Sequence, residues 1–329
     1  MTLSRNFELS TGQRVHLIGD PHLGKKFGQD QGVLFHRLGE RETRQAAHFA
    51  AELDADADVI VMIGDLFDNP YVSDAVIVAA ARAALSAAER NEDVLYVFIA
   101  GNHDKPRNLT LVGAWHAFRE MTQGRLDNLI ILDRPHAVAG LAFFPWEWDR
   151  RADDQVADLA HVVGVEHAIG HWDMSVFDGK DDHLAPVAAL RAAFGEDIGL
   201  WSGHYHVAGE YPVGDGIVHG IGSMEPYAQG EGDMYVTLTR EEALTRDDLR
   251  DKHVRVLLAP GEDIPDLDCL AITHKRVRGE EEEIEVTVSP EDFDFPRLVK
   301  ERIQTRDPRI REFIEERMSL NVTAPEEQC

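Results

Sequence analysis

The chain has 329 residues, with 33 basic and 60 acidic side chains and a formal net charge of -27. This length suffices for one large domain and a smaller one, and so strong a negative charge excludes a generally nucleic-acid-binding surface. No run of about 18 apolar residues occurs, and the polar start lacks the apolar stretch of a secretory signal. We therefore expect a cytoplasmic protein (in the host cytoplasm if the chain is phage-encoded) that has no membrane partner.

Short apolar, β-branched runs that end at a glycine recur through the first 240 residues. They occupy residues 15–19, 59–64, 94–101, 165–170 and 200–203, and such runs are typical of strands buried on both faces. Stretches of helical period lie between the first three, at 41–53 and 73–89. The alternation predicts an α/β layered fold. Shorter strands with glycine-rich turns at 217–239 predict a meander that completes a second sheet.

The remaining residues have the pattern of a separate small α/β unit. After a charged helical linker at 240–250, alternating apolar residues predict strands at 254–258 and 284–288. Proline at the first helical position predicts helices that begin near 290 and 308. We therefore predict a catalytic domain at 1–240, a small α/β capping or partner-binding region at 241–320, and a disordered tail at 321–329.

Five segments with side chains that bind metals follow predicted strands. They are Gly19-Asp20-Pro21-His22, Gly64-Asp65-Leu66-Phe67-Asp68, Gly101-Asn102-His103-Asp104, Gly170-His171, and Gly203-His204-Tyr205-His206. A single motif of this kind is weak evidence, because a lone histidine is more often a surface or core residue than a ligand. Five in succession, at the strand ends where open α/β sheets place their ligands, predict a functional site.

The residue types in these segments favour a centre with two cations. Asp20 and His22 are two apart, as are His204 and His206, so on an extended chain each pair points the same way. A carboxylate such as that of Asp65 can bridge two cations about 3.5–4 Å apart. Imidazole, carboxylate and amide oxygen together suit Mn, Fe or Zn better than Mg, and manganese is our first choice.

The ordered motifs resemble those of the calcineurin-like metallophosphoesterase superfamily over residues 14–239. The segments 20–24, 64–68 and 102–104 are similar to the SbcD-type DNA nuclease branch, and 169–173, 202–206 and 221–223 resemble its phage recombination endonucleases. Protein phosphatases of the superfamily usually carry Gly-Asp-x-Val-Asp-Arg-Gly in the second motif and Asn-His-Glu in the third, and this sequence has neither. The resemblance implies a four-layer α-β-β-α sandwich.

The resemblance also implies roles for individual residues. One metal would be held by Asp20, His22, Asp65 and His206, and the other by Asp65, Asn102, His171 and His204. His103 would be the catalytic histidine that binds no metal, Asp104 would orient it, and Asp68 would support the second motif from outside the ligand set. The reaction implied is hydrolysis of phosphodiester bonds by a hydroxide activated by two divalent metal ions, most readily Mn²⁺.

Four basic residues lie in the same segments and are candidate DNA contacts: Lys25, Lys26, Lys105 and Arg107. Three of them belong to the chain's seven lysines, although they are equally well explained as ordinary loop residues of an acidic protein. Among the tryptophans, Trp172 directly follows a proposed ligand and is the better candidate for a functional role. Trp146 and Trp148 are assigned to packing.

The resemblance implies DNA as the substrate, a role in repair or recombination, and an ATPase partner of the SbcC type with a long coiled coil; a homodimer also remains open. An alternative is a phosphoesterase that acts on a small molecule or a phosphoprotein, because the metal centre does not identify the substrate. The negative charge favours that alternative. A catalytically dead scaffold is a third, which the complete ligand set argues against.

Overall fold

The computed structural model describes residues 5–175, 181–228 and 230–277. The N-terminal part of the chain forms a five-stranded sheet. The strands are β1 (Asn6–Glu8), β2 (Arg14–Ile18), β3 (Val59–Ile63), β4 (Leu95–Ile99) and β5 (Leu129–Leu132), in that order across the sheet. β2 to β5 are parallel, and β1 is antiparallel at one edge. β3 is buried along its whole length, which explains its uninterrupted apolar sequence.

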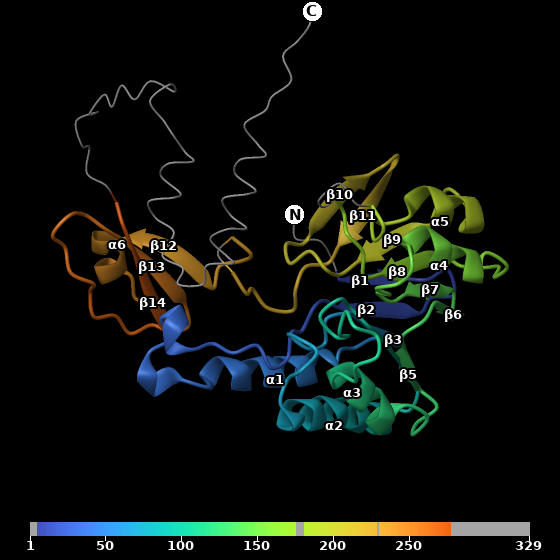
Figure 1. Ribbon diagram of the computed structural model, residues 1–329, viewed down its shortest axis with the longest axis horizontal. Coiled ribbons are helices and arrows are strands. Elements are labelled where there is room, and N and C mark those ends of the chain that lie inside the picture. The colour runs from blue at the N-terminus through green and yellow to red at the C-terminus, as the bar shows by residue number, and fades with distance from the viewer. Residues whose placement is uncertain (1–4, 176–180, 229, 278–329) are drawn as a thin grey trace, which may run out of the picture. The chain divides into compact units, whose positions relative to one another are not determined.

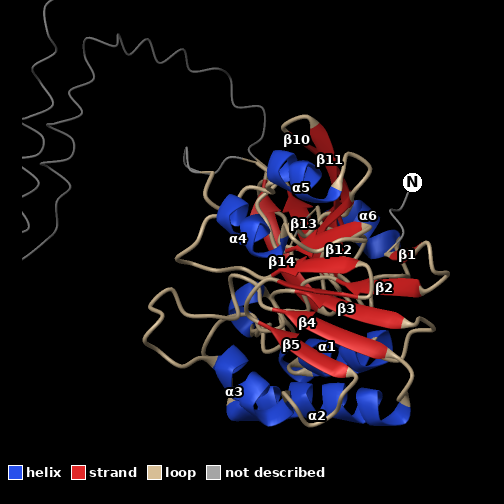
Figure 2. Cartoon of the chain, turned by 90° about the vertical axis from the view of Figure 1, so that its right-hand side faces the viewer, coloured by secondary structure: helices blue, strands red, loops and turns tan. Residues whose placement is uncertain are grey.

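Three helices cover the outer face of this sheet: α1 (Glu40–Glu52), α2 (Asp74–Arg90) and α3 (Ala114–Thr122) (Figure 2). Two short 3-10 helices, Gln29–Gln31 and Phe35–Arg37, precede α1. Ile60 and Met62 of β3 pack toward the helices, against residues such as Phe49. Successive strand side chains point to opposite faces, so the intervening residues of β3 face the other way.

A six-stranded sheet packs against that other face. Its strands are β6 (His136–Val138), β7 (Leu141–Phe144), β8 (His167–Gly170), β9 (Gly199–Ser202), β10 (Gly209–Val213) and β11 (Gly216–Gly220), in the order β10-β11-β9-β8-β7-β6. Val61, Phe143 and Ile169 meet in the core between the sheets. α4 (Ala152–Leu159) and α5 (Val187–Phe194) cover its outer face, so the predicted four-layer α-β-β-α sandwich is confirmed (Figure 1).

A third, parallel sheet contains β12 (Tyr235–Thr239), β13 (His253–Leu258) and β14 (Ala271–Arg276). The predicted meander at 217–239 is therefore wrong in part, because β11 joins the second sheet whereas β12 pairs with β13. The predicted linker helix is α6 (Arg240–Thr245), whose first turn is capped by the Thr239 side chain, which accepts the backbone N–H of Glu242.

Several predictions concern residues 278–329, which lie outside the described part of the chain. They are the strand at 284–288, the helices that begin near 290 and 308, and the tail at 321–329. The domain boundaries at 240 and 320 stay predictions. None of the helices in the described ranges is long and apolar enough to cross a membrane.

Candidate metal centre

The predicted ligand segments converge where the two stacked sheets present the carboxyl ends of their parallel strands. Asp20, Asp65 and Asn102 follow β2, β3 and β4 of the first sheet. His171 and His204 follow β8 and β9 of the second. Parallel strands that share a direction end at one edge, so residues far apart in sequence meet there.

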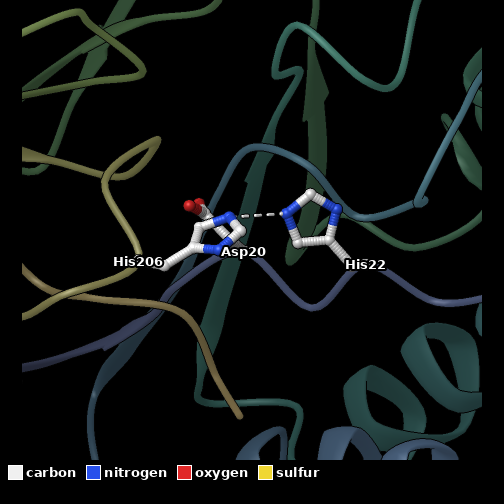
Figure 3. Close-up of side chains that lie close together, drawn as sticks. All are labelled: Asp20, His22 and His206. Carbon is white, nitrogen blue, oxygen red and sulfur yellow. Dashed lines mark hydrogen bonds between the residues drawn. The ribbon is translucent and has the colours of Figure 1, made fainter. Parts of the chain in front are cut away.

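Asp20, His22 and His206 form the first cluster, and one donor atom from each lies within 4.8 Å of the others. The Nε2 atoms of His22 and His206 are 3.0 Å apart, with the Asp20 carboxylate beside them (Figure 3). The ring of Tyr227 packs against both imidazoles, at centroid distances of 5.1 and 5.6 Å. Three residues from two distant loops therefore present donors to a common point.

Asp65, His171 and His204 form the second cluster by the same criterion. The Oδ1 atom of Asn102 lies 2.8 Å from His171 Nε2 and 3.0 Å from His204 Nδ1, so the amide oxygen belongs to this group. Asp65 Oδ2 is 3.3 Å from His171 Nε2 in this cluster and 3.8 Å from His22 Nε2 in the first. Asp65 thus lies between the clusters, the position that a bridging carboxylate requires.

The chemistry of these donors fits two divalent cations. Asp20 is fully buried, and neither carboxylate oxygen has a hydrogen-bond partner among the described residues. Burial raises the pKa of Asp20 well above its ordinary value, and the charge of Asp65 adds to this effect. A buried carboxylate without a hydrogen-bond donor is costly, and a bound cation would remove that cost.

The pKa values of the second cluster point the same way. Burial opposes charge on both Asp65 and His171, but their mutual attraction outweighs it. The pKa of Asp65 is lowered, and that of His171 is raised to about 10. The site therefore stabilises positive charge next to Asp65, which is the property a metal site needs.

In the second cluster, each histidine has one ring nitrogen within hydrogen-bond distance of an oxygen acceptor. His171 Nδ1 lies 2.9 Å from the carbonyl oxygen of Ile63, and His204 Nε2 lies 2.9 Å from Asp173 Oδ1. Such contacts fix the tautomer and direct the other nitrogen, here His171 Nε2 and His204 Nδ1, toward a metal. Sequence analysis did not identify Asp173 in this role.

In the first cluster, only His206 has such an acceptor: its Nδ1 lies 3.2 Å from Glu231 Oε1. His22 Nδ1 has no hydrogen-bond partner among the described residues, and Asp68 Oδ1 is 3.8 Å away. The supporting role of Asp68 stays a prediction. Glu231, which also accepts the backbone N–H groups of Tyr227 and Ala228, was not identified from the sequence, because nothing in its neighbourhood resembles a ligand motif.

The backbone at the ligands is strained. In the described ranges five residues other than glycine have a positive φ, and four of these are proposed ligands. They are Asp20 at 28°, His22 at 46°, Asp65 at 50° and His204 at 72°. Residues with a Cβ rarely adopt this conformation, and its concentration at one site is typical of functional geometry maintained by the surrounding fold.

Glycines next to the ligands leave room for the ligand side chains. Gly64 has a φ of +84°, and a Cβ built there would lie 2.2 Å from His171 Nδ1. A Cβ at Gly101 would lie 2.2 Å from Asp65 Oδ1. Any side chain at either position would therefore displace a ligand.

Comparison with known protein families assigns the chain to a family. Residues 13–208, which include all the proposed ligands, match the family described as calcineurin-like phosphoesterase. The chain belongs to the calcineurin-like phosphoesterase family. Comparison with curated proteins gave no match. Family membership and the two clusters together make the chain a metal-dependent phosphoester hydrolase.

In this calcineurin-like phosphoesterase, His103 is an exposed histidine beside the ligands. Its ring centroid is 4.9 Å from that of His22, and its backbone N–H donates to Asp65 Oδ1 over 2.8 Å. His103 Nδ1 lies 2.6 Å from the carbonyl oxygen of Asp68, so Nδ1 carries the proton in the neutral ring. His103 Nε2 is then the nitrogen left to face a substrate.

Asp104 does not orient His103 as predicted. Its carboxylate accepts backbone N–H groups from Gly101 at 2.8 Å, Phe67 at 2.9 Å and Leu66 at 3.3 Å. These hydrogen bonds join the loops after β3 and β4, so Asp104 supports the loop backbone and does not contact the reacting groups. Burial, with the charge of Asp65, raises the pKa of Asp104 to about 7.

The four candidate phosphate contacts differ in exposure. Lys105 is buried, with a pKa lowered by burial, so the structure argues against its use as a DNA contact. Lys25 is partly buried, and its Nζ lies 3.1 Å from Asp68 Oδ1. Lys26 and Arg107 are exposed, and the guanidinium of Arg107 lies 4.9 Å from the ring centroid of Trp148.

The functional role predicted for Trp172 is wrong, whereas Trp146 is buried, as its assignment to packing predicts, and also lies beside the ligands. The Trp146 ring lies 5.5 Å from that of His204 and 6.1 Å from that of His171, so it forms a wall of the second cluster. Trp172 is buried in the core between the second sheet and its helices, with its ring 5.7 Å from that of Phe144. Trp146 is therefore the tryptophan at the metal centre.

Proposed function

We propose that the protein is a DNA nuclease that hydrolyses phosphodiester bonds with two divalent cations bound, manganese being the first choice. The observation that carries the proposal is Asp65, which lies between two ligand clusters with the exposed His103 beside it. This arrangement suits in-line displacement at phosphorus, and the SbcD-like motifs favour a nucleic acid as the substrate.

The chain's own residues divide the work. Asp20, Asp65 and Asn102 would hold the two cations through oxygen atoms, and the four histidines of the clusters would hold them through ring nitrogens. Bound cations polarise the phosphoryl oxygens and lower the pKa of water toward neutrality. The Nδ1–H of His103 donates to the Asp68 carbonyl, so either role requires the imidazolium form, in which Nε2 also carries a proton. That Nε2–H would stabilise charge on the phosphoryl group or be transferred to the leaving oxygen.

A diester is favoured over a monoester by the residue after Asp68. Protein phosphatases of the superfamily usually carry arginine at this place in the second motif, whereas this chain has Asn69. A monoester phosphate bears between one and two negative charges at neutral pH (its second pKa is about 6), and a diester bears one. Asn69 adds no cation for the extra charge, which agrees with a diester substrate.

DNA contacts in so acidic a chain have to be local. Lys26 and Arg107 are exposed in loops that flank the ligands, and they are the first residues to test. Action in repair or recombination, with an ATPase partner of the SbcC type, follows from the same motif resemblance and is part of the proposal.

The test is an assay of the purified protein with Mn²⁺ on linear duplex DNA, single-stranded DNA and bis-nitrophenyl phosphate, with Asp65→Ala as the inactive control. We expect the wild type to cleave DNA, and Lys26→Ala with Arg107→Ala to weaken DNA binding and flatten its salt dependence. Hydrolysis of the dye ester without cleavage of either DNA would contradict the proposal.

The second candidate is a phosphoesterase for a small molecule or a phosphoprotein. The net charge of -27 favours it, because it disfavours long polyanionic substrates. Faster hydrolysis of nitrophenyl phosphate than of its diester would favour this reading.

A further inference from the structure

Arg41, on α1, is a buried arginine that joins three parts of the fold. Its Nη1 donates to the hydroxyl of Tyr235, on β12, over 3.0 Å and lies 2.7 Å from Nε2 of His253, on β13. Its Nη2 donates to the carbonyl oxygen of Pro226. Burial, followed by the charge of Arg41, lowers the pKa of His253 to about 4, so that ring is neutral and Nε2 accepts. One guanidinium thus connects α1 to two strands of the third sheet and to the segment before β12.

Arg41 also acts on the residues on either side of Pro226. Its Nε lies 3.7 Å from Oε2 of Glu225, and both atoms are buried with no hydrogen-bond partner among the described residues. The Tyr235 hydroxyl, which accepts from Arg41, donates in turn to the carbonyl oxygen of Tyr227 at 2.9 Å. Arg41 therefore acts on three successive residues, the last of them through the Tyr235 hydroxyl.

Tyr227 brings this segment to the first cluster. Its ring packs against the imidazoles of His22 and His206, at centroid distances of 5.1 and 5.6 Å. Its hydroxyl donates to the carbonyl oxygen of Pro21, which lies between Asp20 and His22 in the chain. A shift in the backbone of Tyr227 therefore moves the surface against which both imidazoles pack. Contacts of this kind, made outside the ligands themselves, orient metal ligands and change metal affinity.

We propose that Arg41 and Tyr235 are positioning residues for the first cation site, and that they couple the affinity of that site to the third sheet. Their hydrogen bonds hold the backbone at Tyr227, whose ring in turn holds the two imidazoles. In the described ranges neither Arg41 nor Tyr235 forms a hydrogen bond, ion pair or ring contact with a residue of the second cluster. The inference rests on the proposed pair of cations, but not on DNA as the substrate.

Tyr235→Phe tests this role with the smallest change. It removes the hydroxyl and keeps the ring, which stacks on that of His253 at a centroid distance of 4.5 Å. The measurement is a calorimetric titration of the metal-free full chain with Mn²⁺, in which the step that His206→Ala abolishes belongs to the first cluster. We expect Tyr235→Phe to weaken that step about tenfold, at the low end of the range for residues that support metal ligands. The other step should stay unchanged.

Two control variants separate positioning from stability. Tyr96→Phe also removes a buried tyrosine hydroxyl, one that donates to the carbonyl oxygen of Leu53 at 3.1 Å near the amino end of β4, whereas the ligands lie at the carboxyl ends. Arg44→Ala removes another contact between α1 and the third sheet, an ion pair of 2.6 Å with Asp251 just before β13. Neither variant should change an Mn²⁺ step, whatever its effect on Tm.

Arg41→Lys extends the test to the guanidinium. Lysine keeps a positive charge opposite Glu225, but one nitrogen replaces the two that donate to Tyr235 and Pro226. We expect it to weaken the first-cluster step at least as much as Tyr235→Phe does. If Arg41→Lys does not fold, Tyr235→Phe decides alone.

Failure of this inference and failure of the proposed function give different results. If the wild type binds two Mn²⁺ ions and Tyr235→Phe binds both with the same affinities, Arg41 and Tyr235 only support the fold and the inference is wrong. Equal weakening of both steps would also overturn it, because the variant would then act on the domain as a whole. If the wild type binds fewer than two cations, the proposed centre is contradicted and the inference with it.

Discussion

The two ligand clusters are supported by different parts of the fold. In the second cluster, His171 follows directly on β8, its side chain is fully buried, and its ring is held by the carbonyl oxygen of Ile63 at the end of β3. In the first, His206 lies in the loop beyond β9 and its side chain is 27% exposed. Its support comes from Glu231 and Tyr227, in a segment far along the chain.

This difference bears on metal affinity. Packed strands hold Asp65 and His171 of the second cluster. His204, whose side chain is 22% exposed in the loop beyond β9, depends on its contacts with Asp173 and Asn102. The first cluster depends on hydrogen bonds from Gln45 and Tyr227 to the carbonyl of Pro21 and on the contact from Glu231. We expect the second cluster to bind its cation more tightly, and the first to be the more sensitive to changes in residues 223–231.

Removal of Asp65, the ligand shared by both clusters, should weaken metal binding at both, so that their affinities no longer differ. Asp65→Ala takes a donor from both, so we expect hydrolysis of bis-nitrophenyl phosphate to fall to background and the metal content to drop. Elemental analysis of the purified variant measures the second effect. Asp56→Ala, at an aspartate whose side chain is 90% exposed, is the control. Retention of two metals by Asp65→Ala would show that Asp65 is not a bridge.

His103 belongs to neither cluster, although one of its ring nitrogens lies within 4.8 Å of donor atoms of His22 and Asp65. We predict that it is not a ligand, so its loss should leave both clusters intact. His103→Ala should keep the full metal content and lower kcat about 10²–10⁴-fold, the usual contribution of a positioned acid–base group. His36→Ala, at an exposed histidine, provides the comparison for a histidine remote from the ligands. Loss of metal together with activity would instead make His103 a ligand.

Variants of Glu231, which contacts His206, and of Asp173, which contacts His204, test the difference between the two clusters most directly. Glu231→Gln should weaken one step of a calorimetric Mn²⁺ titration about 10–100-fold, the range found for residues that orient metal ligands. Asp173→Asn should have a smaller effect on the other step, because Asn102 and the strand ends still hold the second cluster. Equal losses in the two variants would contradict the proposed difference in support.

The smallest effect concerns pH and the segment that carries Tyr227. Hydrogen bonds with Glu225 and then Glu52 raise the pKa of His48 to about 9, from an ordinary value of 6.5. The raised pKa means that this contribution to stability is complete below about pH 6.5 and is lost as the pH rises through about 9. It should amount to about 1 kcal/mol at most, because the His48 side chain is 38% exposed and the pair is screened.

The pH effect can be measured from melting temperatures. The difference in Tm between the wild type and His48→Ala should shrink from about pH 6 to about pH 10. A difference that is constant over this range would exclude a charged contact between His48 and Glu225.

The sandwich and the ligand positions could be predicted from sequence because each depends on local patterns. An apolar run such as that of β3 specifies a buried strand, and the Gly-Asp that follows marks the turn with the ligand. Glu231 could not be predicted as a support, because it is one acidic residue among 60 and lies in no motif. Asp173 ends the motif at 169–173, but only the tertiary fold shows that it contacts His204.

The wrong prediction of a functional role for Trp172 could have been avoided. Where a chain is extended, successive side chains face opposite ways. Since His171 points into the site, the adjacent Trp172 points into the core behind it. The pairing of β12 with β13 was harder to predict, because short alternating strands do not specify which sheet they join.

The central claim is that Asp65 joins two cation sites built from the ends of two stacked sheets. Anomalous diffraction from a crystal soaked in manganese tests it most directly. We predict two peaks about 3.5–4 Å apart, one beside Asp20, His22 and His206 and the other beside Asn102, His171 and His204, with Asp65 between them. A single peak, or two that do not share Asp65, would contradict the account.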